Sequence, residues 1–431
     1  MPDEKNFESN ASRRFLIGVL ALLAALILVS GCTPPETIPP PLVPLATLSP
    51  PKTIFSEPAA RIVPTIRIKL GDDAPEAVVK IHGAFRLADL STGRTLLAGA
   101  RMDNGHFTCD QHGLLLLNAQ SLPAPRVEIL PADDGTVEVF GALYHGRLRV
   151  MAVRGQVRLV NAVDLEQYLP SVVGQEMYPS WHLEALKAQA VAARSYALYE
   201  MRRGGADPEF DLFATQKSQA YPGMNSETDN SRQAVKETRG VILAFDDGGV
   251  ERVLPAFYHS TCGGHTFNAA DVFPGRPGVD AVRGVACGYC TSAKCYRWQA
   301  VVPAETFRRE FQADVPGGAA MCPINRAAVR PDDLTADGRV RTVSLWTTPD
   351  KSQRWPVPEE TFKQLFPPDQ KVRSDRFSVS FVAGHLLVSG AGYGHGVGMC
   401  QFGAETLAAG GRKAEAILSY YYPAAHLARA Y

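Results

Sequence analysis

Short runs of apolar residues, separated by turn residues, characterise the chain between residues 65 and 163. The runs are IRIKL, AVVKI, TLLAG, LLLL, VEVF, LRVMAV and VRLV, and Gly, Asp and Asn separate them, as in GDD, DDG and NG. Apolar and β-branched runs bounded by such residues are typical of β-strands. The pattern predicts an antiparallel β-rich region over residues 65–163, with no long helix.

A helical pattern follows between residues 180 and 199. Apolar residues recur there at helical spacing and form one stripe: Leu183, Leu186, Ala190, Ala193 and Ala197. Because most of this stripe is alanine, a neighbouring element can approach it closely. We expect Ser180, directly after Pro179, to cap the helix through its hydroxyl. Lys187, Val191 and Arg194 form a second stripe that carries two positive charges.

The remainder of the chain mixes short helices and strands. A helix is expected over residues 229–238, and GVILAF and ERVLPAFYHS are expected to pair as a hairpin. Farther on, TFRREF, EETFKQLF, AETLAAGG and AEAILSYYY indicate helices, RTVSLW a strand, and FSVSFVAGHLLVSGAG a second hairpin. The predicted fold class is therefore α+β, with a mixed region over residues 164–431 built around the Ala-rich helix.

The N-terminal segment has the pattern of a targeting signal. Arg13 and Arg14 precede an apolar run from residue 15 to 29, which is short for a membrane span and ends in VSGC. This ending resembles a bacterial lipobox, with cleavage after residue 31 and lipid attachment to Cys32; an uncleaved membrane anchor is the alternative. Both predict an exported protein that is held at a membrane and faces the periplasm or cell wall.

Residues 32–64 are rich in proline and poor in charge, as in TPPETIPPPLVP and LSPPK. Such a sequence favours extended polyproline geometry and acts as a semi-rigid tether. The whole chain of 431 residues carries 44 basic and 44 acidic side chains. A formal net charge of zero gives no support for a nucleic-acid partner.

One acidic residue, Glu176, stands in the apolar run VVGQEM, just before the Ala-rich helix and, by this pattern, outside it. A carboxyl group in apolar surroundings has a raised pKa and keeps its proton near neutrality, which is what a general acid requires. Lys187 and Arg194 could oppose this by keeping Glu176 ionised, or they could bind an anionic substrate. A purely structural ion pair between Glu176 and Arg194 is the alternative.

A group of cysteine and histidine residues follows the predicted hairpin. Two close pairs, separated by a loop, suit a tetrahedral zinc site with the ligands Cys262, His265, Cys287 and Cys290. Cys295 and His259 are possible replacements in this set. Four protein ligands leave no open position, so the zinc would be structural. Disulfides are the competing interpretation, because an exported protein meets an oxidising compartment.

Near the C-terminus, glycine alternates with other residues in GYGHGVGMCQ. Glycine allows positive φ and lets the backbone approach a ligand closely, and His395 and Gln401 add polar side chains there. The segment lacks the GK[ST] of a phosphate-binding loop. A purely structural turn is one alternative, and a cysteine hydrolase using Cys400 with His395 is another.

Two long motifs in this chain resemble the signature of the SpoIID/LytB family, named for stage II sporulation protein D. They are VNAVDLEQYLPSVVGQEM followed by EALKAQAVAARSYAL, and GAGYGHGVGMCQFGAETLA over residues 390–408. The resemblance extends from about residue 64 to the C-terminus. It implies a lytic transglycosylase that acts on peptidoglycan glycan strands, with Glu176 as its acid, and a structural zinc held by the cysteine cluster.

The resemblance further implies roles for the residues around the motifs. A lytic transglycosylase needs only one carboxyl group, because the C6 hydroxyl of the sugar is the nucleophile and a 1,6-anhydro product forms. Supporting or substrate-binding residues are then expected in the motifs and in the matching region between them: Lys187, Gln189, Arg194, Tyr258, His395 and Gln401. No organic cofactor is expected. The rival interpretation is a non-enzymatic amidase enhancer that binds wall polymer and stimulates a partner hydrolase.

Overall fold

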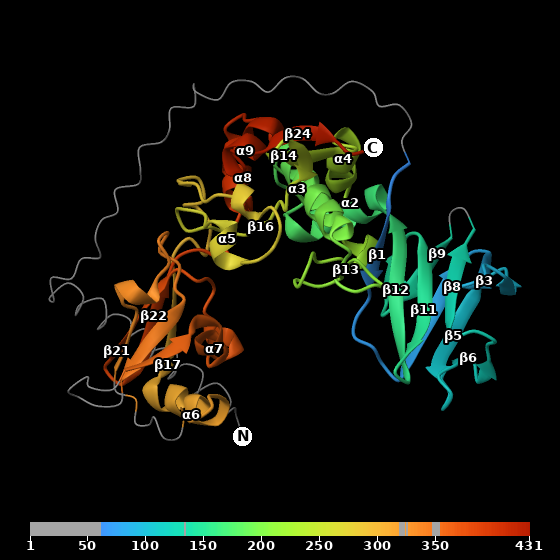
Figure 1. Ribbon diagram of the computed structural model, residues 1–431, viewed down its shortest axis with the longest axis horizontal. Coiled ribbons are helices and arrows are strands. Elements are labelled where there is room, and N and C mark those ends of the chain that lie inside the picture. Colours follow the sequence, from blue (N-terminus) through green and yellow to red (C-terminus); the bar gives the residue numbers. More distant parts are fainter. Residues whose placement is uncertain (1–61, 133–134, 319–323, 325, 347–353) are drawn as a thin grey trace, which may run out of the picture. The chain divides into compact units, whose positions relative to one another are not determined.

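The computed structural model describes residues 62–132, 135–318, 324, 326–346 and 354–431 (Figure 1). The chain divides into the units Met1–Leu45 and Ala46–Tyr431, and all described residues belong to the second. The predicted lipobox, Cys32 and most of the tether lie outside the described residues. In the described part of the chain, helices are too short or too polar to cross a membrane.

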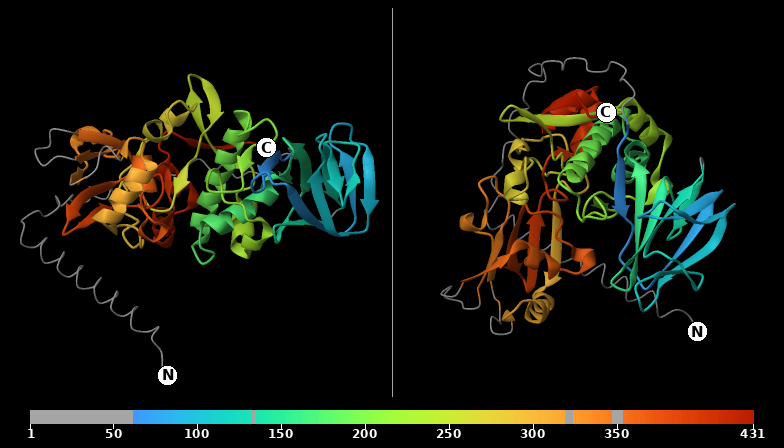
Figure 2. Two further views of the ribbon diagram at one scale, coloured as in Figure 1. Left: turned by 90° about the horizontal axis from the view of Figure 1, so that it is seen from below. Right: turned by 45° about the vertical axis from the view of Figure 1, so that its right-hand side comes forward.

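Two sheets account for residues 65–163, as Figure 2 shows in blue to green. One sheet has the order β13-β1-β12-β11-β8-β3-β4 and the other β10-β9-β2-β5-β6-β7. The pairing is antiparallel except between β1 and β13. The strands are β1 (Thr65–Lys69), β2 (Glu76–His82), β3 (Phe85–Asp89), β4 (Thr95–Gly99), β5 (Met102–Cys109), β6 (Leu115–Leu117), β7 (Gln120–Ser121), β8 (Arg126–Pro131), β9 (Thr136–Val139), β10 (Ala142–Tyr144), β11 (Arg147–Val153), β12 (Gln156–Asp164) and β13 (Leu212–Phe213).

Burial along these strands follows the predicted alternation. In β2 every second residue is buried and those between are exposed. Such a strand has one face on the core and one in solvent, as is usual in antiparallel sheets. Ile66, Val79, Phe107 and Leu148 are fully enclosed in this core. The expected antiparallel β-rich region is confirmed.

Two helices, not one, follow the β-rich region: α2 (Leu165–Glu176) and α3 (Leu183–Arg202). Asp164 caps α2 by accepting a hydrogen bond from the Glu166 N–H. The sequence carries the signal for α2, since its buried residues recur at helical spacing: Leu165, Tyr168, Leu169, Val172 and Val173. Pro170 and Gly174, which usually disfavour a helix interior, obscured this pattern.

One prediction about this segment is confirmed and one is wrong. Glu176 lies outside the Ala-rich helix α3, although it is the last residue of α2, a helix that the pattern did not predict. Ser180 does not cap α3, whose N-cap is His182. The reason lies in a tertiary contact, because Glu405 accepts hydrogen bonds from the His182 N–H and pairs with its imidazole, which fixes where the helix begins.

α3 is the central helix of this part of the chain (Figure 1). It packs against α2, α4, α8, α9 and β14, and its alanines are almost all buried, as the small-residue stripe predicted. The surrounding elements are α4 (Asp229–Glu237), β14 (Val241–Asp247), β15 (Val250–Val253), β16 (Tyr258–His259), α5 (Ala269–Val272), β23 (Met399–Cys400), α8 (Gln401–Ala409), α9 (Ala414–Tyr421) and β24 (His426–Arg429).

The predicted hairpin of β14 and β15 is confirmed, but its second strand ends at Val253. Tyr258 and His259 belong to a separate strand, β16, which pairs in parallel with β23. Pro255 lies between the two strands and cannot donate to a ladder, which is consistent with the break. As a result, the segment around Tyr258 lies beside the glycine-rich C-terminal motif, about 140 residues away in sequence.

Residues 298–390 have a separate hydrophobic core, centred on Phe307, Phe311, Phe362 and Leu386. Its hairpin and two helices lie where the sequence predicted them. The elements are β17 (Trp298–Pro303), α6 (Ala304–Asp314), β18 (Arg326–Ala328), β19 (Thr342–Trp346), β20 (Arg354–Pro358), α7 (Glu359–Gln364), β21 (Phe377–Val382) and β22 (His385–Gly390). Antiparallel pairing predominates in the chain's sheets, and helices and sheets alternate irregularly, so the α+β class is confirmed.

Candidate functional site

Glu176 ends α2 with its carboxylate close to two neutral donors. The Ala220 N–H donates to Oε1 over 3.4 Å, and Gln401 Nε2 donates to Oε2, also over 3.4 Å. Burial raises the pKa of the Glu176 carboxyl, and these two hydrogen bonds offset that effect only in part. Among the described residues, no cationic side chain lies within 4.0 Å of this carboxylate. The arrangement favours a carboxyl group that retains its proton.

Gln401 brings the second predicted motif to the first. It begins α8, directly after β23, and its Nε2 also donates to Gln189 Oε1 over 3.4 Å. Gln189, on α3, is fully buried, and its Nε2 has no hydrogen-bond partner among the described residues. A buried donor without a partner is costly, so such a group favours a water or ligand beside it. The structure thus gathers Glu176, Gln189 and Gln401 in one place.

Tyr258 belongs to a buried polar network behind this group. Its hydroxyl accepts a hydrogen bond from Gln219 Nε2 over 3.0 Å, and Tyr168 donates to Gln219 Oε1 over 3.1 Å. Burial, and then the nearby Glu176 carboxylate, raise the pKa of Tyr258 well above its ordinary value. Tyr258 therefore stays a neutral hydroxyl. The sequence alone does not distinguish Gln219 or Tyr168, because the polar loop around Gln219 has no distinguishing pattern and Tyr168 is one aromatic in an apolar helix face.

His395 lies in an aromatic and histidine cluster and makes no described hydrogen bond to Glu176. Its ring centroid is 5.4 Å from that of Phe273 and 5.6 Å from that of His259. Burial lowers the pKa of His395 to about 4, so the imidazole is neutral near pH 7. Its Nδ1 accepts a hydrogen bond from the Val397 N–H over 3.1 Å, which fixes the ring within the glycine-rich turn.

Glycine is required at several positions of this turn. Gly398 has φ +70°, and a Cβ there would lie 2.0 Å from the Phe257 carbonyl oxygen. Gly396 has φ +74°, and a Cβ there would lie 2.6 Å from the Phe267 ring. The glycines therefore allow the turn to press against the segment before and after β16. This close approach places Gln401 beside Glu176.

Arg194 and Lys187 do not face Glu176 as the sequence suggested. Arg194 is fully buried and donates from Nε and an Nη to the two oxygens of Glu166, each over 2.9 Å. Lys187 pairs with Glu184 at 2.9 Å and with Glu237 at 2.6 Å. The alternative interpretation, a structural ion pair between Glu176 and Arg194, is therefore wrong. The partner of Arg194 is Glu166, ten residues before Glu176, in the helix α2 that the sequence pattern conceals.

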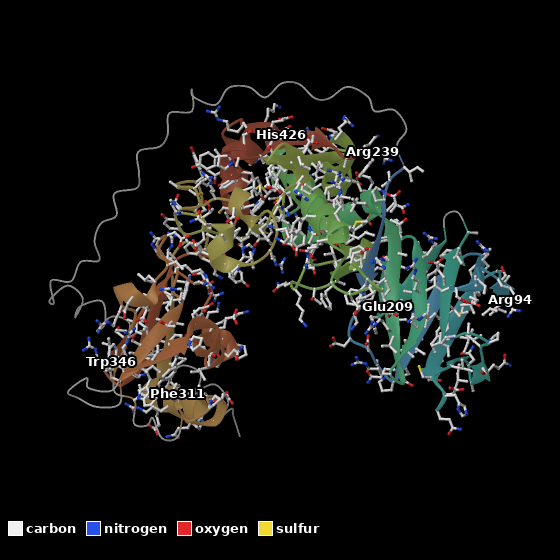
Figure 3. The ribbon with its side chains drawn as sticks, in the orientation of Figure 1. Arg94, Glu209, Arg239, Phe311, Trp346 and His426 are labelled. Atoms are coloured by element: carbon white, nitrogen blue, oxygen red, sulfur yellow. The ribbon has the colours of Figure 1, made fainter. Side chains whose placement is uncertain are left out.

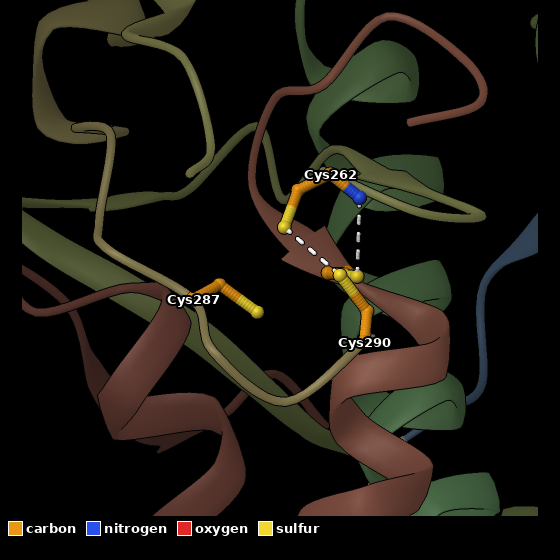
Figure 4. A group of neighbouring side chains, drawn as sticks. Cys262, Cys287 and Cys290 are labelled. Atoms are coloured by element: carbon orange, nitrogen blue, oxygen red, sulfur yellow. Dashed lines mark hydrogen bonds between the residues drawn. The ribbon is translucent and has the colours of Figure 1, made fainter. Parts of the chain in front are cut away.

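The cysteine cluster contains four thiols: Cys262, Cys287, Cys290 and Cys400. Their sulfur atoms all lie within 4.8 Å of one another, and all four residues are buried. Figure 4 shows three of these side chains converging. Tetrahedral Zn–S bonds of about 2.3 Å place sulfur atoms somewhat less than 4 Å apart. The separation of 3.5 Å between the sulfurs of Cys262 and Cys290 is close to this value.

Backbone N–H groups donate to two of these four sulfurs. The Cys262 N–H donates to Cys400 Sγ over 3.3 Å, and the Gly264 N–H donates to Cys262 Sγ over 3.4 Å. N–H groups directed at sulfur stabilise thiolates, which are the form that ligates a metal. The described cysteines are not joined as disulfides. The donor set fits a four-thiolate zinc site.

The predicted ligand set needs one correction, because Cys400 occupies the place assigned to His265. His265 lies outside the group, paired through its backbone with Ala286. The alternatives Cys295 and His259 are also outside it, and His259 Nδ1 lies 3.0 Å from the Val397 oxygen instead. Sequence spacing favoured a ligand near the other three. Cys400 is more than 100 residues away, and only the pairing of β16 with β23 brings it there.

The four thiols connect the two strands that carry site residues. Cys262 follows β16, which holds Tyr258, and Cys400 ends β23, directly before Gln401. A metal ion bound by these thiols would hold the two segments together. Cys400 is thus part of the thiol group, and no described hydrogen bond joins it to His395, as a cysteine hydrolase would require.

The chain is similar in sequence to a protein family and to several known proteins. Residues 153–245 match the family model described as SpoIID, stage II sporulation protein. An uncharacterised protein of Brachyspira hyodysenteriae is 29% identical over 83% of this chain and 91% of its own length. The stage II sporulation protein D of Bacillus subtilis is 25% identical over 63% of this chain and 76% of its own length.

A further relative bears on the alternative function. The amidase enhancer of Bacillus subtilis is 27% identical over 59% of this chain, and the match covers 39% of that protein. The family match contains α2, α3 and Glu176. The resemblance that the two motifs indicated is confirmed by these matches.

Proposed function

With residues 153–245 matching the SpoIID family and most of the chain similar to a relative, we propose that this protein cleaves peptidoglycan glycan strands as a lytic transglycosylase. The similarity to sporulation protein D and to an amidase enhancer supports a function in peptidoglycan processing. The finer assignment, to strand cleavage by Glu176, depends on the site geometry.

The setting of Glu176 is the observation that carries the proposal. Its carboxyl is desolvated, its pKa is raised, and its described hydrogen-bond partners are two neutral donors. A general acid needs a proton at the operating pH, and an adjacent cation would remove that property. Among the described hydrogen bonds, none joins a second carboxylate to the side chain of Glu176, Gln189 or Gln401. This setting suits a reaction that needs one carboxyl group.

The proposed reaction uses Glu176 twice. Its proton moves to the glycosidic oxygen as the bond from that oxygen to the anomeric carbon breaks. Positive charge then develops on the sugar, where nearby dipoles can stabilise it. The sugar's own C6 hydroxyl attacks the anomeric carbon, and the Glu176 carboxylate accepts the hydroxyl proton. The products are two shorter strands: one has a free hydroxyl where the glycosidic oxygen was, and the other ends in 1,6-anhydromuramic acid. The acid is restored without water.

Other motif residues have more specific roles in this proposal. Gln401 orients the carboxyl of Glu176, and the buried Gln189 supports Gln401 by accepting a hydrogen bond from it. Gln219 holds the neutral hydroxyl of Tyr258 in place by a hydrogen bond. His395 is neutral and stabilises the glycine-rich turn. Arg194 and Lys187 support the fold around α3 and do not touch the acid.

We propose that Cys262, Cys287, Cys290 and Cys400 hold a structural zinc ion, with the four sulfurs as its complete ligand set. The ion would contribute stability, and this chain's residues would supply all of the catalytic groups. The protein is proposed to be exported and anchored by lipid on Cys32, with the proline-rich segment as its tether. This location brings the site to its substrate outside the cytoplasmic membrane.

The second candidate is a non-catalytic amidase enhancer that binds wall polymer and acts through a partner hydrolase. The similarity to the Bacillus subtilis protein of that name favours it. Both candidates predict binding to glycan strands. Only the first requires the carboxyl group of Glu176.

The deciding experiment uses the full chain, solubilised in detergent, with denuded and with intact peptidoglycan and no partner protein. A Glu176→Gln variant is the test, and Glu305→Gln, the same exchange on an exposed helix, is the control. Mass spectrometry then detects 1,6-anhydromuramic ends. We expect such ends from the parent and from Glu305→Gln, and none above background from Glu176→Gln.

The other outcomes identify the alternatives. Ordinary reducing ends would show a hydrolase with a second carboxylate. Strand binding without cleavage, equal in all three proteins, would support the enhancer. Anhydro ends from Glu176→Gln at the parent's rate would remove Glu176 from the reaction.

A further inference from the structure

A cavity lies on the side of α3 that faces away from Glu176. Its volume is about 670 Å³, within the range of ligand-binding pockets, and α3, α4, α9 and β24 line it. Lys187 lies at this cavity and Gln189 at the Glu176 site. Residues two apart on an α-helix point about 200° from each other, so the two sites lie on opposite faces.

The cavity has a surplus of positive charge. Five basic and three acidic side chains line it, a difference of two charges. Glu184 and Glu237 are already paired with Lys187, and Glu184 also accepts from the Ala414 N–H. In the described part of the chain, no carboxylate lies within 4.0 Å of the side chains of three lining cations, namely Lys236, Arg239 and Arg429. Among the acidic lining residues that the structure describes, Glu415 alone has no cationic side chain within 4.0 Å.

One of these cations has an unsatisfied donor. Arg429 uses an Nη group to donate to the Arg239 carbonyl oxygen over 3.2 Å, but its buried Nε has no hydrogen-bond partner among the described residues. A buried guanidinium N–H without a partner is rare in a folded protein. Figure 3 labels Arg239 on this part of the surface. The donors suit a planar anion such as a carboxylate, which arginine binds with two parallel hydrogen bonds.

Apart from Thr238, the remaining lining is apolar, and hydrogen bonds hold the elements around it in place. Val191, Val241, Leu418 and Leu427 contribute hydrocarbon side chains. Arg194 lies beneath them and donates to the carbonyl oxygens of Val235 and Val241, which ties the end of α4 to β14. A rigid cavity with cations and apolar side chains suits a carboxylate attached to a small apolar group.

We propose that this cavity is a second, non-catalytic site that binds the carboxylate-bearing groups of the wall polymer, and this rests on the proposed function for its choice of polymer. Two sources have this chemistry. The lactyl group of muramic acid carries a carboxylate beside a methyl group once the stem peptide is removed, and the stem peptide carries carboxylates beside alanine methyl groups. The site would recognise charged substituents of the polymer, while Glu176 acts on its sugar backbone.

The test measures binding by isothermal titration calorimetry in the full chain carrying Glu176→Gln, so that no ligand is consumed. The probes are the disaccharide of N-acetylglucosamine and N-acetylmuramic acid, a stem tetrapeptide, and neutral chitobiose. The test variant adds Lys236→Gln and Arg239→Gln, both exposed residues. The control adds Arg202→Gln and Arg232→Gln, which remove the same charge from exposed helical positions outside the cavity.

We expect a carboxylate probe to bind more tightly than chitobiose and to lose about tenfold or more in affinity in the test variant, since hydrogen bonds to charged groups are strong. The control should change affinity less than twofold. Loss for the disaccharide would identify the lactyl carboxylate as the ligand, and loss for the tetrapeptide would identify the stem peptide.

Equal affinity of the test variant and its parent for both carboxylate probes would overturn the proposal, as would equal binding of chitobiose. Circular dichroism of each variant verifies folding. The cleavage assay is independent of this measurement. Anhydro ends without carboxylate binding would reject only the cavity proposal, and carboxylate binding without anhydro ends would reject only the transglycosylase.

Discussion

The two ends of α2 carry the same residue type in opposite settings. Glu166, in the first turn, meets the guanidinium of Arg194, the Gly240 N–H and the Tyr431 hydroxyl. Glu176, the last residue, meets one amide N–H from the backbone and one from a side chain. Both carboxyls are largely buried, so burial alone does not distinguish them.

Their pKa values differ in direction. Burial acts to raise the pKa of Glu166, but the charge and hydrogen bonds of Arg194 lower it overall. Burial raises the pKa of Glu176, and its two weaker hydrogen bonds do not reverse this. The helix dipole acts in the same sense, because it favours negative charge at the N-terminus and disfavours it at the C-terminus. The partner of a buried glutamate, and not burial alone, therefore decides the direction in which its pKa shifts.

The largest expected effect is on catalysis at the C-terminal end. Glu176→Gln should lower the rate of anhydro-end formation by about 10²–10⁴-fold, the usual contribution of general acid–base catalysis. Its unfolding free energy should stay equal or rise, because the exchange removes a desolvated carboxyl group that has no cation. Product analysis and urea denaturation measure the two quantities. A large loss of stability in this variant would contradict the comparison.

The opposite behaviour is expected at the N-terminal end. Arg194→Leu leaves Glu166 buried without its cation and should lower the unfolding free energy by about 3–5 kcal/mol. Urea denaturation followed by circular dichroism measures this loss. Arg202→Leu, at an exposed position of the same helix, is the control and should change stability by less than about 0.5 kcal/mol. Similar stability of the two variants would show that the buried pair is not structural.

Removal of the metal should disturb the C-terminal end of α2, at Glu176, more than its N-terminal end, at Glu166. Since Cys400 directly precedes Gln401, loss of a zinc ion would loosen the donor beside Glu176. We expect a chelator, or Cys400→Ser, to lower the melting temperature by several degrees, because a bound ion stabilises the folded state. Calorimetry and zinc analysis check this. Cys295→Ser, outside the thiol group, should retain the metal. Metal-free protein with mapped disulfides among the four thiols would contradict the zinc proposal.

The pH dependence of stability should differ between the two carboxyls. The contribution of Glu166, whose folded pKa is lowered, is present above its ordinary value of 4.5 and is lost as the pH falls through the folded value. For Glu176, whose folded pKa is raised, the favourable contribution is present below 4.5 and is lost as the pH rises through the folded value. The stability advantage of Glu176→Gln over the parent should therefore grow from about pH 4 to pH 8.

The smallest expected effect concerns Gln401. Its hydrogen bond lowers the pKa of Glu176, so Gln401→Leu should raise that pKa further and move the alkaline limb of the rate profile to higher pH. The pH dependence of cleavage checks this, because the acid loses its proton on that limb. Gln299→Leu, in the separate core region and on an exposed strand position, is a matched control with no expected shift. An unchanged limb in Gln401→Leu would show that this hydrogen bond does not act on the acid.

Much of the fold was readable from local pattern. Alternation along β2, the alanine stripe of α3 and the hairpin of β21 and β22 each follow from the period of their own side chains. The failure to predict α2 also had a local origin. Pro170 and Gly174 concealed α2, although Gly174 is required because a Cβ there would lie 1.9 Å from the Ser226 carbonyl oxygen.

For the site, the sequence by itself determined that Glu176 lies in an apolar setting, and its motifs indicated the resemblance to the SpoIID/LytB family. The tertiary structure decided which groups surround it. Arg194 binds Glu166 and not Glu176, Cys400 joins the thiols in place of His265, and Gln401 meets Glu176 across more than 200 residues. Helical and strand periods fix the direction of a side chain on its own element, whereas the pairing of distant elements fixes what that side chain meets.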